Sequence, residues 1–162
     1  MYRIEYDVIS DALCHQIISV LNPDSVQQFK GYKSLIFSTH TSVYISKAIT
    51  KCLKLIEDGW RPAWLTYAEM TPGPGLVKHI DIVPDGVIAE GAPLSESIIT
   101  FVMYLNDEFV GGELVVDGND AYKPSAGSVV VFNGGRDAHQ VLPIFEGHRH
   151  TLTLWCIPNK KA

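Results

Sequence analysis

Two residues of one short segment, His79 and Asp81, carry side chains of the kinds that bind metal ions. They lie in Val77–Ile82, an apolar-rich run that predicts a β-strand. Alternate residues of a strand point to the same face, so these two share a face while Lys78 and Ile80 point to the other. An imidazole and a carboxylate side by side can supply two ligands of one metal ion, although the same spacing also occurs on ordinary polar strand faces.

A third candidate ligand, His139, follows the glycine turn at Gly134-Gly135. Two histidines and one carboxylate, with coordination positions left open, form the facial triad of non-haem Fe(II) oxygenases. The same donors also bind zinc. Asp137, two residues before His139, is either a group that orients this histidine or a solvated acid of the turn.

Arg149 lies ten residues after His139, at the entry to a predicted strand, and its face continues through Thr151, Thr153 and Trp155. An arginine that points into a protein interior needs an anionic partner, because an unpaired buried charge is very costly. Its planar fork suits a carboxylate, which a ligand can supply where no Asp or Glu does. A simple zinc hydrolase has no need of such a residue, so Arg149 favours an oxygenase that binds a dicarboxylate.

The segment from about 64 to 158 resembles the 2-oxoglutarate/Fe(II) oxygenases, specifically the prolyl-4-hydroxylase-like branch. The motifs that carry this resemblance occur in the family's order and spacing. They are Tyr104–Asp107 with Gly111–Leu114, Pro124–Ser128 with Val131-Phe132, and His139–Pro143 with Gly147–Arg149 and Thr153–Trp155.

The resemblance implies a set of site residues. His79, Asp81 and His139 become the iron ligands, and Arg149 the partner of the distal carboxylate of 2-oxoglutarate. Several further residues then become candidates for cosubstrate binding. Tyr104 falls where the family places a tyrosine that hydrogen-bonds this carboxylate, Thr153 offers a hydroxyl on the inward face, and Tyr67 is either a further cosubstrate contact or a plain core aromatic.

The activity that the resemblance implies is a dioxygenase reaction with Fe(II), 2-oxoglutarate and O2, and with ascorbate as an additional reductant. The carboxylate of Asp81 favours hydroxylation over halogenation. The substrate expected first is a prolyl or other amino-acid residue in a peptide or protein. A free amino acid or small metabolite is the alternative, and a non-catalytic metal- and 2-oxoglutarate-binding protein or a zinc enzyme on a similar barrel are rivals from other classes.

The bulk properties limit the partners and the compartment. The chain has 162 residues and a net charge of −5, which predicts a single domain (1–162) and no nucleic-acid partner, since phosphate backbones select basic surfaces. Neither a leader peptide nor a long apolar run stands out, so we expect a cytoplasmic protein without a membrane anchor. The three cysteines show no metal-site spacing and predict buried free thiols.

The elements that must position these residues fall into two parts. Residues 1–59 are expected to provide helical support, with helices over about 10–21 and 42–57. Residues 60–158 are expected to form a jelly-roll core of short strands, and 84–97 a loop at its rim. The predicted fold is therefore mainly β with N-terminal helices, a double-stranded β-helix (jelly roll) buttressed by two or more helices. The expected strands are Ala63–Met70, Leu76–Val83, Ile98–Leu105, Glu113–Asp117, Ser128–Asn133, His139–Pro143 and His150–Ile157.

Overall fold

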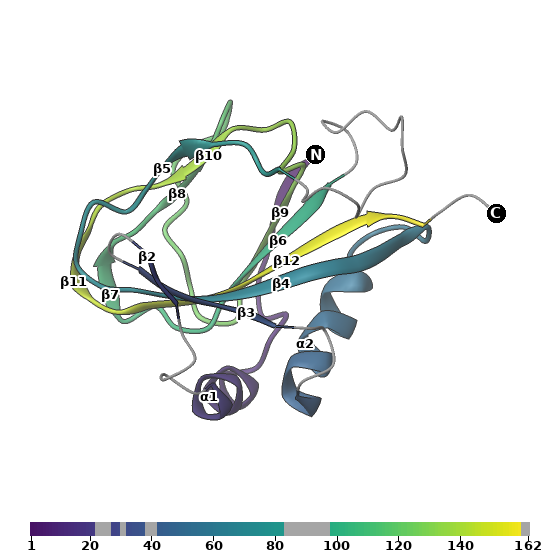
Figure 1. Ribbon diagram of the computed structural model, residues 1–162, viewed down its shortest axis with the longest axis horizontal. Coiled ribbons are helices and arrows are strands. Elements are labelled where there is room, and N and C mark those ends of the chain that lie inside the picture. Colours follow the sequence, from purple (N-terminus) through teal and green to yellow (C-terminus); the bar gives the residue numbers. More distant parts are fainter. Residues whose placement is uncertain (22–26, 30–31, 38–41, 83–97, 160–162) are drawn as a thin grey trace.

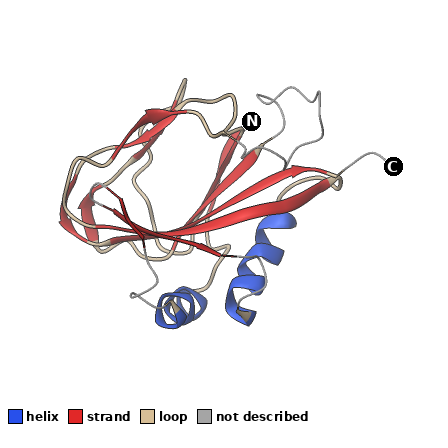
Figure 2. Ribbon diagram, viewed as in Figure 1, coloured by secondary structure: helices blue, strands red, loops and turns tan. Residues whose placement is uncertain are grey.

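The computed structural model describes residues 1–21, 27–29, 32–37, 42–82 and 98–159. Within them lie two helices, α1 (Asp11–Val20) and α2 (Val43–Leu53), and many short strands (Figure 2). The strands are β1 (Tyr2–Glu5), β2 (Gln27–Phe29), β3 (Tyr32–Phe37), β4 (Trp60–Met70), β5 (Leu76–His79), β6 (Ile99–Tyr104), β7 (Phe109–Gly111), β8 (Leu114–Val116), β9 (Val129–Phe132), β10 (His139–Val141), β11 (Ile144–Gly147) and β12 (Arg149–Pro158). The expected loop at 84–97 lies outside the described residues.

Both predicted helices are present, and a capping serine immediately precedes each of them. The Ser10 side chain accepts a hydrogen bond from the backbone N–H of Leu13, and Ser42 accepts one from Tyr44. These hydroxyls satisfy N–H groups that the first turn of a helix leaves unpaired. Helix α2 ends four residues earlier than predicted, because the chain after Leu53 tightens into bonds between residues three apart.

Seven antiparallel strands form the large sheet, in the order β1-β9-β6-β12-β4-β3-β2. Both helices lie on one side of it, and the short strands β5, β8 and β10 lie on the other (Figure 1). Strands β6 and β9 are therefore buried on both faces, which accounts for their nearly continuous apolar sequences.

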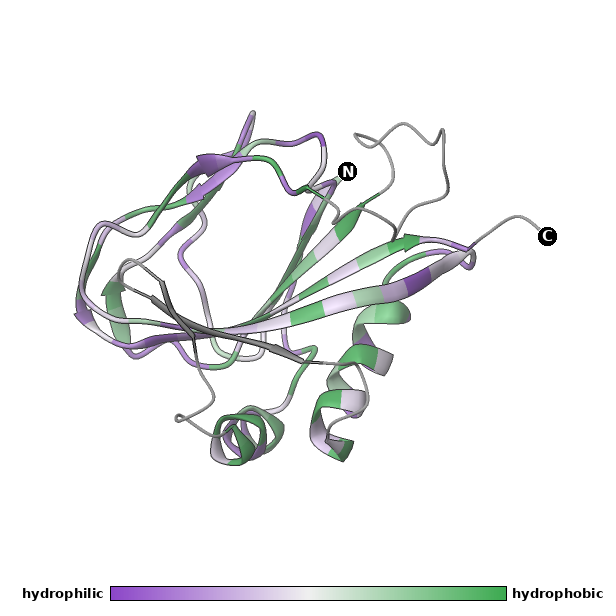
Figure 3. Ribbon diagram, in the orientation of Figure 1, coloured by the Kyte–Doolittle hydropathy of each residue, from purple (hydrophilic) through white to green (hydrophobic). Residues whose placement is uncertain are grey.

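The main hydrophobic core lies between the helices and the large sheet. Alternate residues of the central strands point into it, and the bands of hydrophobic residues along these strands are visible in Figure 3. The core includes Ile17, Ile45, Ala48 and Cys52 from the helices and Phe101, Val131, Leu152 and Leu154 from the sheet. The other residues of the same strands are thereby left to face the opposite side of the sheet.

The amino-terminal third differs from the prediction, because it also contains strands. Strand β1 pairs with β9 at one edge of the large sheet, and β3 pairs with β4 toward the other. The segment expected to provide helical support, residues 1–59, therefore contributes strands to the large sheet in addition to the two helices. The partner of β1 lies far away in the sequence, whereas β3 pairs with the adjacent β2 as well as with the more distant β4.

A smaller layer closes over the large sheet. The strands β5-β10-β8 form a three-stranded sheet, and β11 pairs with β7. Side chains from both layers meet in a second hydrophobic cluster that includes Tyr104, Leu114, Phe132, Val141 and Ile144. The two layers form the predicted double-stranded β-helix, with the site residues between them. No helix in the described part of the chain is long and apolar enough to cross a membrane.

Candidate active site

A cavity of about 440 Å³ lies between the two layers of the jelly roll. Alternation along the strands places polar and apolar groups on its wall. The large sheet contributes Thr66, Ala68, Met70, Thr100, Val102, Arg149, Thr151, Thr153 and Trp155, and the rest of the wall comes from Leu76, Val77, His79, Asp81, Leu114, His139 and Val141. The cavity thus contains the three predicted metal ligands and the predicted arginine together.

The structure brings His79, Asp81 and His139 into one cluster. His79 and His139 lie opposite each other in the pairing of β5 with β10, and their ring centroids are 4.4 Å apart. The Oδ1 atom of Asp81 lies 3.8 Å from Nε2 of His79 and 3.5 Å from Nε2 of His139. Two imidazole nitrogens and one carboxylate oxygen therefore converge on a single point, which suits a divalent transition metal.

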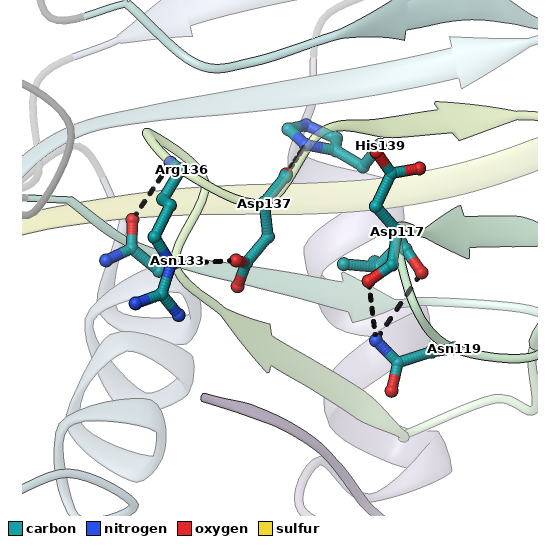
Figure 4. A network of polar contacts seen from close by, with 7 residues as sticks. Asp117, Asn119, Asn133, Arg136, Asp137 and His139 are labelled. Atoms are coloured by element: carbon teal, nitrogen blue, oxygen red, sulfur yellow. Dashed lines mark hydrogen bonds and ion pairs between the residues drawn. The ribbon is translucent and has the colours of Figure 1, made fainter.

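Backbone carbonyls hold both histidines in the form that can bind a metal. The Nδ1 atom of His79 lies 2.8 Å from the carbonyl oxygen of Val77, and that of His139 lies 2.9 Å from the carbonyl oxygen of Asp137 (Figure 4). A neutral imidazole that donates its Nδ1–H to a carbonyl has an unprotonated Nε2, which can bind a metal. Asp137 thus orients His139, but through its backbone, since its carboxylate pairs with Arg136.

Hydrogen bonds hold Asp81 in place at both its backbone N–H and its side-chain carboxylate. Its N–H donates to the carbonyl of Gly134 (2.8 Å), and its Oδ2 accepts from the Thr100 hydroxyl (2.7 Å). Burial by itself raises the pKa of Asp81, but the hydrogen bond and charge of His139, together with Thr100, lower this pKa overall. The aspartate is therefore ionised at neutral pH, as a metal ligand must be.

Arg149 is 2% exposed and forms no ion pair with any acidic side chain among the described residues. Its guanidinium donates to the carbonyl of Gly112 (3.2 Å), to the hydroxyl of Tyr104 (3.2 Å) and to the sulfur of Met70 (3.5 Å). All three partners are neutral, so they do not balance the charge. A buried cation of this kind fits an anionic ligand in the cavity.

Most of the other sequence predictions agree with this arrangement. Thr153 lies on the cavity wall, and Tyr104 is fully buried with its hydroxyl against Arg149. Leu152 and Leu154 point to the helices, and His148 and His150 are absent from the cavity wall, as alternation along β12 predicts. Side chains of one strand thus serve both the core and the cavity.

Of the two alternatives for Tyr67, a cosubstrate contact or a core aromatic, the structure favours the core aromatic. On β4, the cavity wall takes Thr66 and Ala68, whereas Tyr67 belongs to the core on the helix side of the sheet. Its hydroxyl lies 2.5 Å from Nδ1 of His150, on the side of the sheet away from the cavity. The physical reason is the two-residue period of a strand, which places neighbouring side chains on opposite faces.

Three residues that sequence reasoning did not assign also contact the site. Met70 and Gly112 bond to Arg149, and the space beside Gly134 is filled by the Asp81 and Thr100 side chains. Gly112 belongs to the Gly-Gly-Glu-Leu motif, so the sequence did contain a sign that this residue lies near the site. The roles of Met70 and Gly134 follow from pairings between distant strands and have no local signature.

The sequence was compared with models of protein families and with curated protein sequences. The model of the 2OG-Fe(II) oxygenase superfamily matches residues 65–157, more than half of the chain. No curated protein sequence matches the chain significantly.

Several solved structures share its fold. A viral collagen prolyl hydroxylase from Paramecium bursaria Chlorella virus-1, in a 2-oxoglutarate complex, is 18% identical with a TM-score of 0.79, covering 98% of this chain and 96% of that one. A Pseudomonas putida prolyl-4-hydroxylase is 19% identical with a TM-score of 0.69, covering 98% and 92%. HygX from Streptomyces hygroscopicus, with nickel and 2-oxoglutarate bound, is 13% identical with a TM-score of 0.78, covering 98% and 83%.

At these identities the structural likeness establishes the fold, and the family model establishes the family. The cavity agrees with both, because it holds a His-Asp-His donor set and a buried arginine without an anionic partner in the described residues. The chain therefore belongs to the 2-oxoglutarate/Fe(II) oxygenase superfamily, and it is an Fe(II)- and 2-oxoglutarate-dependent dioxygenase.

Proposed function

We propose that this enzyme hydroxylates an unactivated C–H bond of a prolyl or other amino-acid residue in a peptide or protein. In this proposal His79, Asp81 and His139 hold the iron, and Arg149 binds the distal carboxylate of 2-oxoglutarate. The observation that carries the proposal is the position of Arg149, a buried and uncompensated cation on the wall of the cavity that contains the three metal-ligand side chains.

The protein's own residues have separable roles. The carbonyls of Val77 and Asp137 keep the two histidines ready to bind metal, and Thr100 fixes the carboxylate of Asp81. When bound, Fe(II) and 2-oxoglutarate together reduce O2, so that one oxygen atom enters the substrate as a hydroxyl and the other enters succinate, with release of carbon dioxide.

The remaining wall of the cavity positions the cosubstrate and limits water. Tyr104 adds a hydroxyl beside the guanidinium of Arg149, and Thr153 offers another on the same strand face. The apolar side chains of Val102, Leu114 and Val141 exclude water around the reacting groups, which protects a reactive centre from side reactions.

The choice of a peptidyl substrate is supported by the two prolyl hydroxylases that share the fold over nearly the whole chain. A small-molecule substrate is the second candidate. It is favoured by the likeness to HygX, a protein of the same fold with a structure that contains hygromycin B. Both candidates use the same iron and cosubstrate site, so the two proposals differ only in what occupies the mouth of the cavity.

The metal and cosubstrate assignments are tested by anaerobic titration with Fe(II) and then 2-oxoglutarate, followed by the visible metal-to-ligand charge-transfer band. We expect the band in the wild-type protein, its loss in His79→Ala and His139→Ala, and a higher 2-oxoglutarate requirement in Arg149→Ala. His15→Ala is the control, because His15 is an exposed residue of α1. An unchanged cosubstrate affinity in Arg149→Ala would refute the role of Arg149.

The substrate class is tested by succinate release under air. Libraries of proline-containing peptides and libraries of free amino acids and small metabolites are compared, with uncoupled turnover subtracted. Stimulation by peptides alone supports the peptidyl proposal. Stimulation by small molecules alone would contradict the peptidyl proposal and support a small-molecule substrate, with the metal and cosubstrate assignments unchanged.

A further inference from the structure

A second group of metal-ligand side chains, Glu69, His148 and His150, lies outside the catalytic cavity. Glu69 is on β4, His150 is on β12, and His148 immediately precedes β12. One potential ligand atom from each residue lies within 4.8 Å of the other two. Arg149, between the two histidines, points into the cavity, so the histidines point to the opposite face of the sheet.

The backbone holds these three positions in a fixed relationship. His150 is directly opposite Glu69 in the antiparallel pairing of β12 with β4, where facing side chains lie close together. The amide of Asn106 accepts from the N–H of His150 (2.9 Å) and donates to the carbonyl of His148 (2.8 Å). His150 is therefore held by the sheet and by Asn106, and the backbone of His148 is held by the same Asn106 side chain, which favours a preformed site.

Polar contacts also orient the side chains. Nδ1 of His148 lies 2.8 Å from Oε1 of Glu69, and Nδ1 of His150 lies 2.5 Å from the Tyr67 hydroxyl. A histidine that binds metal through Nε2 donates its Nδ1–H to an outer oxygen, and Tyr67 provides that oxygen for His150.

We propose that Glu69, His148 and His150 form a zinc site on the outer face of the large sheet, separate from the catalytic metal centre. Zinc binds imidazole and carboxylate ligands and accepts three protein ligands with water at the fourth position. The site is open to solvent, because the His148 side chain is 54% exposed. Zinc bound here joins β4 to β12 beside Arg149, at the point where that residue enters the cavity.

The stoichiometry of zinc binding tests this proposal. We expect the wild-type protein to bind two equivalents in competition with a chromogenic chelator. The double variant His79→Ala/His139→Ala should retain one equivalent, and adding His148→Ala should remove it. The matched control adds His15→Ala instead, which deletes an exposed histidine of α1 and should leave one equivalent bound.

Two further variants keep the result interpretable if the triple variant folds poorly. In the wild-type background, Glu69→Gln keeps the size of the side chain and should reduce the count from two equivalents to one. Tyr67→Phe should weaken the outer site about ten-fold, because it removes the oxygen that orients His150. A double variant that binds no zinc, or a count that His148→Ala and Glu69→Gln leave unchanged, would overturn the proposal.

Discussion

The hydroxyl of Thr100 donates a 2.7 Å hydrogen bond to Oδ2 of Asp81, while Oδ1 of the same carboxylate faces the two histidines. The two oxygens of one carboxylate thus have different partners. Thr100 lies on β6 of the large sheet, so the sheet sets the orientation of a residue that follows the end of β5. The geometry of the metal cluster therefore depends on the packing of one layer against the other.

We expect Thr100→Val to weaken metal binding while the fold is retained. Valine has nearly the shape of threonine but cannot donate a hydrogen bond, and losing an oriented outer-shell contact costs about 10- to 100-fold in metal affinity. Anaerobic Co(II) titration measures this change, and Thr100→Ser is the control because it keeps the hydroxyl. Equal affinities in Thr100→Val and the wild type would show that the hydrogen bond does not position Asp81.

Gly134→Ala should disturb the same carboxylate by crowding. A Cβ at this position would collide with Oδ2 of Asp81 and with the hydroxyl of Thr100. We expect at least a ten-fold loss of metal affinity and a loss of about 1–3 kcal/mol in the free energy of unfolding, typical of overpacking.

Gly73→Ala is the matched control for this change, because the nearest atom to its added Cβ is the backbone oxygen of Thr71 at 3.7 Å. Co(II) titration and urea unfolding measure both effects. If Gly134→Ala binds metal as tightly as Gly73→Ala does, the close approach to Asp81 is not required for the site.

Tyr104→Phe should raise the Kd of 2-oxoglutarate, whereas Tyr67→Phe should leave it unchanged. Tyr104 supplies a hydroxyl beside Arg149, so its removal should raise the Kd of 2-oxoglutarate several-fold, as expected for a hydrogen bond worth about 1 kcal/mol. Tyr67 lies on the other face of the sheet, and its removal should leave this Kd unchanged. Titration of the charge-transfer band compares the two, and a larger effect from Tyr67→Phe would contradict the described orientation.

The three cysteines should be unreactive in the folded protein. Burial raises the pKa of Cys14 to about 11 and that of Cys156 to about 12, and it raises the pKa of Cys52 as well. Since the thiolate is the reactive form of cysteine, a raised pKa leaves little of this form at pH 8. An aromatic disulfide reagent should detect three thiols in guanidinium and none within minutes in native buffer. Rapid labelling of a native thiol would contradict this burial.

The sequence was sufficient to predict the parts of the site that depend on strand alternation. The two-residue period of a strand separates Arg149 from Leu152 on β12, and the predicted pair His79 and Asp81 does lie in one cluster, although β5 ends at His79 and Asp81 is held by Gly134 and Thr100. The motifs around Tyr104 and His139 then indicated the family. These patterns involve residues close together in the chain, so they can be recognised from one sequence alone.

The features that depend on the register between distant strands could not be predicted. The sequence left Tyr67 as either a cosubstrate contact or a core aromatic, because its face follows from the pairing of β4 with β12, where Tyr67 is opposite Leu152. The short strands β1, β7 and β11 have three or four residues each, and their partners lie elsewhere in the chain. Such strands are stabilised by their neighbours and carry little periodicity of their own.

Strand β12 lies between β6 and β4 in the large sheet, with one face toward the helices and the other toward the cavity. This double use has a consequence for protein engineering. Mutations in β12 change stability or cosubstrate binding, so directed evolution of substrate preference has little freedom there. The positions suited to a combinatorial library are cavity residues outside β12, such as Leu76 and Val77 of β5, because changing them leaves both the helix-side core and the arginine in place.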